Sequence, residues 1–388
     1  MKLKKFFAGV LAAAMMLTVG ATAAFAEGPA GGETDNNAVT YHPSETNVDL
    51  GIMKNYKVEK GTAPKEDFTF SVTYVPNNSK PYTTAYTGYD GTYKQPEASK
   101  TATASFKSNM DAKAEAYQES LGIKIQDFNL PAGPGKYCFE IKEKVPDNKT
   151  PGVTYDETTR YLVITVANNE ALDGGYVYYA QLYDSNYAPA TSIKGQATGT
   201  KVDGAKAFTN TYTANNVVIS KDIKGGLGDL AAKFTFKVKL TYADGKNANQ
   251  YVGAKVTEYT DETAEVVNQV WAIDKTTEHT ISLGRNQSIT LTNLPEGVTV
   301  TVEETDGGEY AVSKSTDTTG TLENSTITAT ISKVNDALVD GKIGFINTKE
   351  GTPDMGVILD NAPYIALLTI VAIGGVALML NKRRRDEE

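Results

Sequence analysis

The feature that most constrains the fold of this chain is a set of four short segments that occurs twice in the same order. The first copy contains GIMKNYKV, DFTFSVTY, NLPAGPGKYCFEIKE and AFTNTYT, and the second contains VVISKDIK, KFTFKVKLTY, NLPEGVTVTVEE and GFINTKE. The segments are rich in β-branched and aromatic residues, and Gly, Pro, Asn and Asp punctuate the chain around them. Because roughly 320 residues are too many for one hydrophobic core, the repeat predicts an all-β chain with two tandem β-sandwich domains.

The repeat and the composition together predict five regions along the chain. They are a signal peptide (1–26), a flexible Gly-rich leader (27–46), a first domain (47–214), a second domain (215–350) and a C-terminal sorting segment (351–388). One stretch inside the first domain, NMDAKAEAYQESLG at 109–122, has a helical composition, and we expect a short helix there.

Both ends of the chain carry export signals. Three lysines precede an apolar run from residue 6 to about 21, and Ala24-Phe25-Ala26 follows as a small-x-small cleavage site. Residues 362–380 form an apolar run of membrane-spanning length, followed by a basic tail from Lys382 to Arg385. The alternatives are an uncleaved N-terminal anchor and a permanent C-terminal anchor.

The residues before the C-terminal span resemble a cell-wall sorting signal of Gram-positive bacteria. The segment is Thr352-Pro353-Asp354-Met355-Gly356, and such signals follow the pattern Leu-Pro-x-Thr-Gly. Thr352 stands in place of Leu and Met355 in place of Thr, while the Pro and Gly spacing is kept. The resemblance implies cleavage before Gly356 by a sortase, which transfers the new carbonyl to an amine.

Composition excludes several classes of function. The formal charge is −9, which disfavours nucleic acid as a partner. Cys138 is the only cysteine, so no internal disulfide can form. His42 and His279 are the only histidines, and we find no zinc spacing, phosphate-binding loop or Ser-His-Asp arrangement. We therefore expect no metal, no cofactor and no enzymatic activity, although a glycosidase with paired carboxylates is the rival to be tested.

Strand alternation places three polar side chains of each copy on an apolar face. In the first copy Lys54 follows Ile52, Glu143 follows Ile141, and Asn210 follows Phe208, each two residues later on the same face. The second copy repeats this order with Lys221, Glu304 and Asn347. Ordinary polar groups at strand ends, or a buried Lys–Glu pair with an Asn hydrogen bond, would account for any one of them. Three residue types in the same order in both copies favour a chemical role.

Burial gives these residue types a specific chemistry. Desolvation lowers the pKa of a lysine and raises that of a glutamic acid, so a neutral amine can stand beside a protonated acid. The amine can then attack the Asn carboxamide while the acid polarises the amide and shuttles protons. The product is a Lys–Asn isopeptide bond, with loss of ammonia. Such a bond is a covalent cross-link that needs no cysteine.

From about residue 48 onward the chain resembles the two-domain major pilins of Gram-positive bacteria, in the streptococcal pilin isopeptide-linkage family. Their domains are similar to collagen-adhesin B-type, immunoglobulin-like sandwiches. The resemblance implies a first-strand Lys bonded to a last-strand Asn with a Glu from a middle strand. It therefore assigns Lys54, Asn210 and Glu143 to the first domain. Lys57 competes with Lys54, and alternation favours Lys54.

The same assignment for the second domain is Lys221, Asn347 and Glu304. Glu303 competes with Glu304, and the inward stripe favours Glu304. Because these acids serve a single intramolecular event, the resemblance implies a structural protein rather than an enzyme.

The resemblance also implies a function. The chain would be a pilus shaft subunit that sortase polymerises head to tail, with the Met355 carbonyl as acyl donor. Acceptor candidates are Lys194, Lys201 and Lys206. The expected partners are sortase, identical subunits, peptidoglycan and a host surface ligand, and the product would lie in the cell wall or surface pilus after a membrane-anchored precursor. The alternative is a monomeric wall-anchored adhesin or stalk.

Overall fold

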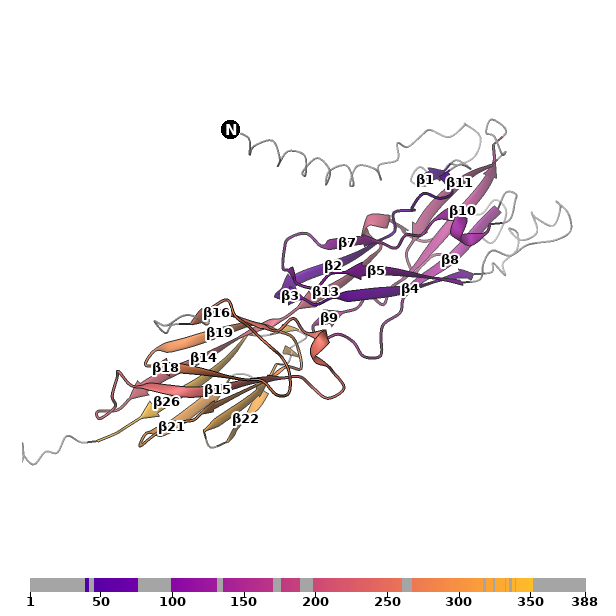
Figure 1. Cartoon of the computed structure of the whole chain (residues 1–388). Coiled ribbons are helices and arrows are strands. Elements are labelled where there is room, and N and C mark those ends of the chain that lie inside the picture. Colours follow the sequence, from indigo (N-terminus) through magenta and orange to yellow (C-terminus); the bar gives the residue numbers. More distant parts are fainter. Residues whose placement is uncertain are drawn as a thin grey trace, which may run out of the picture.

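The computed structural model describes residues 39–41, 45–75, 99–130, 135–169, 176–188, 198–259, 267–316, 319–323, 325–331, 333–334, 337–338 and 340–351. These residues form β-strands and short 3-10 turns arranged as two sandwiches, which follow one another along an elongated molecule (Figure 1). The prediction of an all-β chain with tandem sandwiches is confirmed.

The first sandwich contains strands β1 to β13. One sheet has the order β1-β11-β10-β8-β4-β5, with β12 paired to β11, and the opposing sheet has the order β7-β2-β13-β9. The bounds are β1 (Val39–Tyr41), β2 (Met53–Lys60), β3 (Thr62–Ala63), β4 (Glu66–Val75), β5 (Ser99–Phe106), β6 (Met110–Asp111), β7 (Tyr117–Ser120), β8 (Gly135–Glu143), β9 (Val153–Thr154), β10 (Thr159–Asn168), β11 (Tyr176–Tyr183), β12 (Lys201–Val202) and β13 (Phe208–Thr213).

The second sandwich contains strands β14 to β26. Its sheets have the orders β17-β16-β19-β14-β26-β21 and β18-β15-β20-β23-β22. The bounds are β14 (Asn215–Lys224), β15 (Lys233–Thr241), β16 (Ala254–Tyr259), β17 (Val270–Trp271), β18 (Glu278–Gly284), β19 (Gln287–Leu294), β20 (Thr299–Glu304), β21 (Ala311–Thr316), β22 (Thr319–Glu323), β23 (Thr326–Thr330), β24 (Lys333–Val334), β25 (Ala337–Leu338) and β26 (Gly341–Thr348).

The last strand of each sandwich is the parallel neighbour of a strand near the start of that domain. In the first sandwich β2 pairs with β13, and in the second β14 pairs with β26, whereas the other paired strands are antiparallel. A parallel neighbour places the entry and exit of the chain at opposite ends of the sandwich. This topology explains why the two sandwiches extend end to end (Figure 1).

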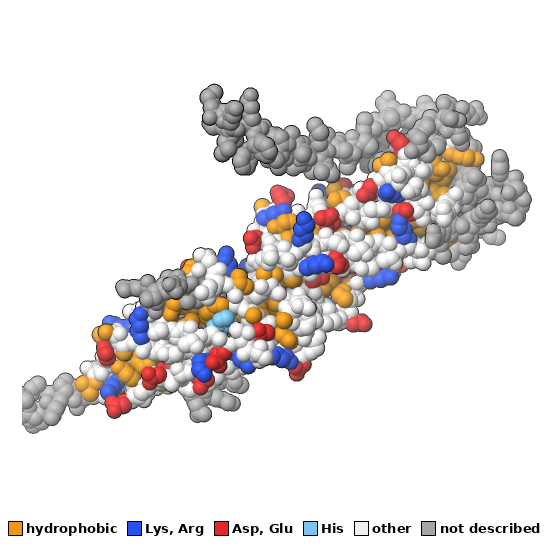
Figure 2. All heavy atoms as spheres, viewed as in Figure 1, with side chains coloured by type: hydrophobic (Ala, Val, Ile, Leu, Met, Phe, Trp, Pro, Cys, Tyr) orange, Lys and Arg blue, Asp and Glu red, His pale blue; other side chains and the backbone are white. Residues whose placement is uncertain are grey.

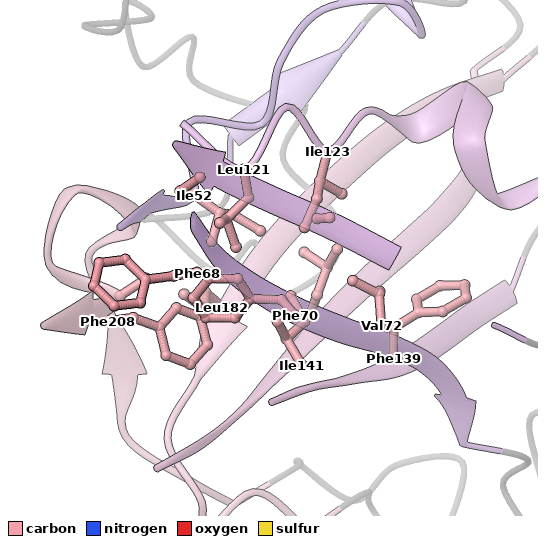
Figure 3. Close-up of a cluster of buried hydrophobic side chains, with 14 of the residues drawn as sticks. Ile52, Phe68, Phe70, Val72, Leu121, Ile123, Phe139, Ile141, Leu182 and Phe208 are labelled. Atoms are coloured by element: carbon pink, nitrogen blue, oxygen red, sulfur yellow. The ribbon is translucent and has the colours of Figure 1, made fainter. Parts of the chain in front are cut away.

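The core between the sheets follows the alternation of the strands. Burial alternates along β4, β8 and β20, so that every second side chain faces the opposing sheet. Figure 3 shows Phe70 of β4 and Ile141 of β8 lying between Phe208 of β13 and Phe139 of β8 in the first core. Burying a large apolar side chain stabilises the fold by about 1.5–3 kcal/mol, so these residues carry much of the stability.

The expected helix at 109–122 is wrong. Residues 117–120 form β7, which pairs with the Met53–Tyr56 part of β2, and Met110–Asp111 forms β6 against β3. Asn109 has a left-handed backbone with φ of 62°, which interrupts a helix at its first residue. Pairing at the sheet edge therefore overrides the local helical composition.

Other sequence expectations fall at the ends of the chain. Residues 39–41, inside the expected leader, form β1 along the edge of β11. The expected signal peptide and the span at 362–380 lie outside the described residues. Within the part of the chain that the structure describes, no helix is both long and apolar enough to cross a bilayer.

A buried side chain, Asn293, makes hydrogen bonds to both sandwiches. Its Oδ1 accepts hydrogen bonds from the backbone N of Thr62, at 2.9 Å, and from the hydroxyl of Tyr212, at 3.1 Å. Its Nδ2 donates to the backbone oxygen of Gly253 at 2.9 Å. Asn293 is only 4% exposed and has a φ of 65°, a conformation that Asn tolerates better than other L-residues. One amide thus satisfies donors from the first sandwich and an acceptor from the second.

Polar contacts around Asn293 extend this junction. Lys60 forms an ion pair with Asp340, whose carboxylate also accepts a hydrogen bond from the backbone N of Asn216. Lys246 donates to Asn148 Oδ1 at 2.8 Å and to the backbone oxygen of Lys149 at 2.6 Å. The exposed pairs contribute little individually, so Asn293 is the main fixed point.

We expect the Asn293→Gly variant to loosen the junction, because Gly keeps the positive φ while the Thr62 and Tyr212 donors lose their acceptor. Leaving buried polar groups unpaired costs about 1–3 kcal/mol. Small-angle scattering should show a wider range of inter-domain angles. The matched control is Asn268→Gly, since Asn268 also has a positive φ but is exposed. Equal scattering profiles for the two variants would contradict the role of Asn293.

Candidate functional site

The first sandwich buries a lysine between its two sheets. Lys54 of β2 is 0% exposed, and its Nζ lies 2.6 Å from Glu143 Oε2 and 2.6 Å from Asn210 Oδ1. Asn210 Nδ2 in turn donates to Glu143 Oε1 at 2.6 Å. Lys54 and Asn210 belong to one sheet and Glu143 to the other. We refer to these three residues as the first cluster, and each of them contacts the other two.

The second sandwich contains the equivalent residues, Lys221, Glu304 and Asn347, here called the second cluster. Lys221 Nζ lies 2.9 Å from Glu304 Oε1, and Asn347 Nδ2 donates to the same oxygen at 2.5 Å. All three residues are at most 2% exposed. Glu304 Oε2 and Asn347 Oδ1 are buried and have no hydrogen-bond partner among the described residues. The second cluster is therefore assembled but less completely hydrogen-bonded.

Strand register explains why the clusters form in both sandwiches. In the parallel pair of the first domain Lys54 lies opposite Phe208, and Phe208 is two residues before Asn210. In the second domain Lys221 lies opposite Phe345, and Phe345 is two residues before Asn347. The glutamates also share a position. Glu143 lies opposite Phe70 and Glu304 opposite Phe236, across the central antiparallel pairs. The same offsets bring the three polar side chains to one level of each core.

Aromatic rings surround both amines. Lys54 Nζ lies 5.0 Å from the ring centroid of Phe68 and 5.5 Å from that of Phe70. Lys221 Nζ lies 4.2 Å and 5.6 Å from those of Phe234 and Phe236. These rings come from the F-T-F sequence on β4 and on β15. They exclude water, and they attract the ammonium form only weakly compared with the hydration it has lost.

Burial changes the proton affinities of the clusters. Desolvation lowers the pKa of Lys54, against the opposing effect of Glu143, and it also lowers the pKa of Lys221, against that of Glu304. Desolvation raises the pKa of Glu143, while Lys54 and Asn210 oppose that shift. The lowered pKa of Lys54 and the raised pKa of Glu143 both favour a neutral amine beside a neutral acid in the first cluster. The arrangement is suited to nucleophilic attack by the amine on the Asn carboxamide.

The competing residues lie elsewhere. Lys57 is half-buried and donates to the backbone oxygens of Lys113 and Ala114. Glu303 is half-buried on the opposite face of β20 from Glu304. The structure therefore brings together the residues that alternation favoured, while their chemical roles remain a prediction.

The sites predicted for polymerisation are only partly described. Lys201, on β12, and Lys206, in the 3-10 turn Gly204–Lys206 before β13, are both exposed. Lys194 and the sorting motif of Thr352, Pro353, Met355 and Gly356 lie outside the described residues. The structure does not bring the described acceptor candidates together with either cluster.

Sequence reasoning missed one residue that contacts the first cluster. The backbone N of Asp156 donates to Asn210 Oδ1 at 2.6 Å. Asp156 follows the short strand β9, and nothing in the sequence around it marks this contact. Among the described residues no group of His, Cys, Asp and Glu is placed to hold a metal ion.

Comparisons with known proteins support a common origin for this arrangement. Residues 50–213 match the family described as a Spy0128-like isopeptide containing domain, and residues 215–337 match a family described as a domain of unknown function. A pilin of Streptococcus pyogenes serotype M1 is 29% identical over 257 residues, which span 64% of this chain and 68% of that pilin. The first domain of the chain matches the isopeptide-containing family, and the chain is similar to a streptococcal pilin. The resemblance inferred from its sequence is confirmed, and it supports a structural protein rather than an enzyme.

Solved structures agree with the fold. The chain matches a crystal structure of a substituted form of the Streptococcus pyogenes major pilin with a TM-score of 0.50 and 21% identity, over 77% of this chain and 98% of that one. The unsubstituted major pilin gives a TM-score of 0.49 at 21% identity over the same shares. At this identity the match with a TM-score of 0.50 supports the sandwich architecture alone.

A further carboxyl of the chain, Glu66, lies at the start of β4, the strand whose Phe70 is opposite Glu143. Burial raises the pKa of Glu66 to about 7, and a hydrogen bond from the Thr150 side chain only partly opposes this. The negative charges of Asp67 and, less strongly, Glu143 also raise the pKa of Glu66. Native Glu66 therefore holds its proton more tightly than it would in the unfolded chain.

We expect this proton to make stability pH-dependent. Because the folded pKa is higher than the ordinary 4.5, the contribution of Glu66 is fully present below pH 4.5 and is lost as pH rises through about 7. The Glu66→Gln variant should match the parent at pH 4.5 and be more stable above pH 7, by up to about 3 kcal/mol. Calorimetric unfolding across this range measures the difference. Glu115→Gln, which changes an exposed carboxylate that does not act on Glu66, is the control, and equal pH profiles for the two variants would contradict the assignment.

Proposed function

We propose that this pilin is the repeating shaft subunit of a Gram-positive pilus and that each of its domains is cross-linked by a Lys–Asn isopeptide bond. The observation that carries the proposal is the pair of buried Lys–Glu–Asn clusters in matching register. The proposed bonds join Lys54 to Asn210 and Lys221 to Asn347, with Glu143 and Glu304 as the acids that promote them.

The chemistry follows from the contacts in the first cluster. Lys54 Nζ attacks Asn210 Cγ, and the Cγ–Nδ2 bond breaks. Glu143 contacts both nitrogens, through Oε2 and Oε1, so it can take a proton from the amine and pass one to the leaving nitrogen. Ammonia leaves, and the burial of the cluster protects the product from hydrolysis. No cofactor or metal takes part.

The topology makes these bonds mechanically useful. A force applied along a shaft enters a domain at its first strand and leaves at its last. Because these two strands are parallel neighbours, the force shears the β2–β13 and β14–β26 pairs. A covalent bond between the paired strands would carry that force past the hydrogen-bonded ladder, so the domain would not extend.

Polymerisation would use the C-terminal segment. Strand β26 runs away from the junction, and the chain then leads through Gly351 to the expected sorting motif. A sortase would cleave after Met355 and transfer its carbonyl to a lysine of the next subunit, and finally to peptidoglycan in the cell wall. Lys194, Lys201 and Lys206 remain the acceptor candidates.

The surface is compatible with a repeating extracellular subunit. On the face shown in Figure 2, acidic and basic side chains alternate without a large patch of one sign. The net charge of −9 keeps separate shafts apart and gives nucleic acid no basic surface to bind. A host surface ligand would have to be recognised by shape and polar contacts rather than by a strong electrostatic field.

We expect the mature pilin to be lighter than its sequence mass by two molecules of ammonia. Lys54→Ala and Lys221→Ala should each restore one ammonia, because each removes one nucleophile. Lys57→Ala and Lys224→Ala are the matched controls and should leave both bonds intact. On a loop-entropy estimate each lost cross-link lowers the unfolding free energy by roughly 5 kcal/mol. An intact mass equal to the sequence mass in the parent would rule out the bonds.

We also expect the pilin to form a sortase-dependent ladder in boiled wall extracts of its host. Restoring the sorting pattern with Met355→Thr should strengthen the ladder, and Gly356→Ala should abolish it. Alanine variants of the three acceptor candidates would then identify the accepting lysine. A single monomer band with and without the pilus sortase would instead indicate the wall-anchored adhesin or stalk.

A further inference from the structure

The two clusters differ in the surroundings of the oxygen that becomes charged during bond formation. In the first domain Asn210 Oδ1 accepts a hydrogen bond from the backbone N of Asp156, at 2.6 Å, in addition to the contact from Lys54. In the second domain Asn347 Oδ1 is buried and has no partner among the described residues. The clusters therefore contain the same residue types but differ at the acyl oxygen, and in the second cluster both nitrogens contact one oxygen of Glu304.

Strand pairing explains the difference. In the first domain β9 pairs with β13 only through Val153 and Thr154, and the chain then leaves the ladder, which frees the N–H of Asp156 to point at Asn210. In the second domain β21 stays paired with β26 through Val312 and Ser313, which lie opposite Asn347 and Ile346. Backbone N–H groups of a paired strand lie in the plane of the sheet and do not point into the core.

The side chain of Asp156 fixes the turn that presents this N–H. Its Oδ2 accepts from the backbone N of Thr209 at 2.7 Å, next to Asn210, and its Oδ1 accepts from the backbone N of Thr158 at 2.9 Å. The preceding residue, Tyr155, is buried against Phe68, and its hydroxyl accepts from the backbone N of Thr150 at 3.1 Å. The donor is thus held from both sides and needs no rearrangement to meet a developing charge.

We propose that the backbone N–H of Asp156 is an oxyanion donor for the Lys54–Asn210 bond and that the Asp156 carboxylate is its positioning group. When Lys54 Nζ bonds to Asn210 Cγ, the electron pair of the C=O bond moves to Oδ1, where the Asp156 N–H stabilises it. The carbonyl then re-forms, the Cγ–Nδ2 bond breaks, and ammonia leaves with a proton delivered through Glu143. This inference rests on the proposed isopeptide bonds.

The two bonds of the unsubstituted chain should form at different rates. The second domain lacks such a donor among its described residues, so its bond should form more slowly than that of the first domain. Removing one donor of this kind typically costs about 100-fold to 1,000-fold in rate. We expect the two bonds of one chain to differ by at least about tenfold, because aromatic walls and registers are otherwise shared.

The test measures both bonds in the full chain made by cell-free translation, in which every chain starts unreacted. Translation is stopped, samples are quenched over time, and tryptic peptides are weighed to follow the Lys54–Asn210 and Lys221–Asn347 branched products separately. The Asp156→Ala variant should slow only the first bond, by about tenfold or more, and Asp156→Asn, which keeps one acceptor oxygen, should be intermediate. Asp274→Ala is the matched control, because Asp274 accepts from Thr276 and Thr277 in a similar turn away from either cluster.

A second readout separates positioning from folding. In a Lys54→Ala background, which cannot form the first bond, amide hydrogen exchange of β13 should be the same with and without Asp156→Ala, except at Thr209, whose N–H bonds directly to the Asp156 carboxylate. Equal rates of the two bonds in the parent, or an unchanged first-bond rate in Asp156→Ala, would overturn the inference. Loss of β13 protection that accounts for the slower rate would also overturn it. Absence of the first bond from the parent would instead refute the proposed function itself.

Discussion

The buried amine on the first strand of each domain is the constraint on which the rest of the structure depends. A lysine that has lost its water must find an acid and an acceptor within hydrogen-bond distance. Lys54 finds Glu143 on the opposing sheet and Asn210 on the neighbouring strand. The contact with Asn210 fixes the register of the parallel strand pair. The contact with Glu143 fixes how the two sheets are aligned against each other. The phenylalanines of F-T-F then close the space around the amine, so that packing and polar chemistry specify the same arrangement.

Much of this arrangement could be predicted from the sequence, because alternation is a strict geometric rule within a strand. Ile52 and Lys54, or Phe208 and Asn210, must share a face once the segment is a strand. The position of the Asn, two residues after a Phe, also indicates the register of the parallel strand pair. The Lys lies opposite that Phe in both domains. Two copies made the pattern informative, because a polar residue on a single apolar face is commonplace.

The remaining features depend on contacts between segments far apart in the sequence. Composition at 109–122 favours a helix, but the free edge of β2 offers pairing that a single-sequence reading does not weigh. Asp156 contacts Asn210 because β9 ends before it. Strand ends are the part of a fold that sequence patterns predict least well. Asn293 belongs to the N-L-P sequence that marks the repeat in both copies, and it lies in β19. Its role at the junction depends on Thr62 and Tyr212 of the other domain.

The junction acquires a particular importance once the domains are cross-linked. With a covalent bond between the first and last strands, neither sandwich can lengthen under tension. Force then passes from β13 to β14 through the short link at Ala214, beside Asn293 and the Lys60–Asp340 pair. A buried amide with three hydrogen bonds can break and re-form without unfolding either core, whereas the sandwiches cannot. The elastic behaviour of such a shaft would therefore be set at the non-covalent junction between domains, and its strength by the two clusters within them.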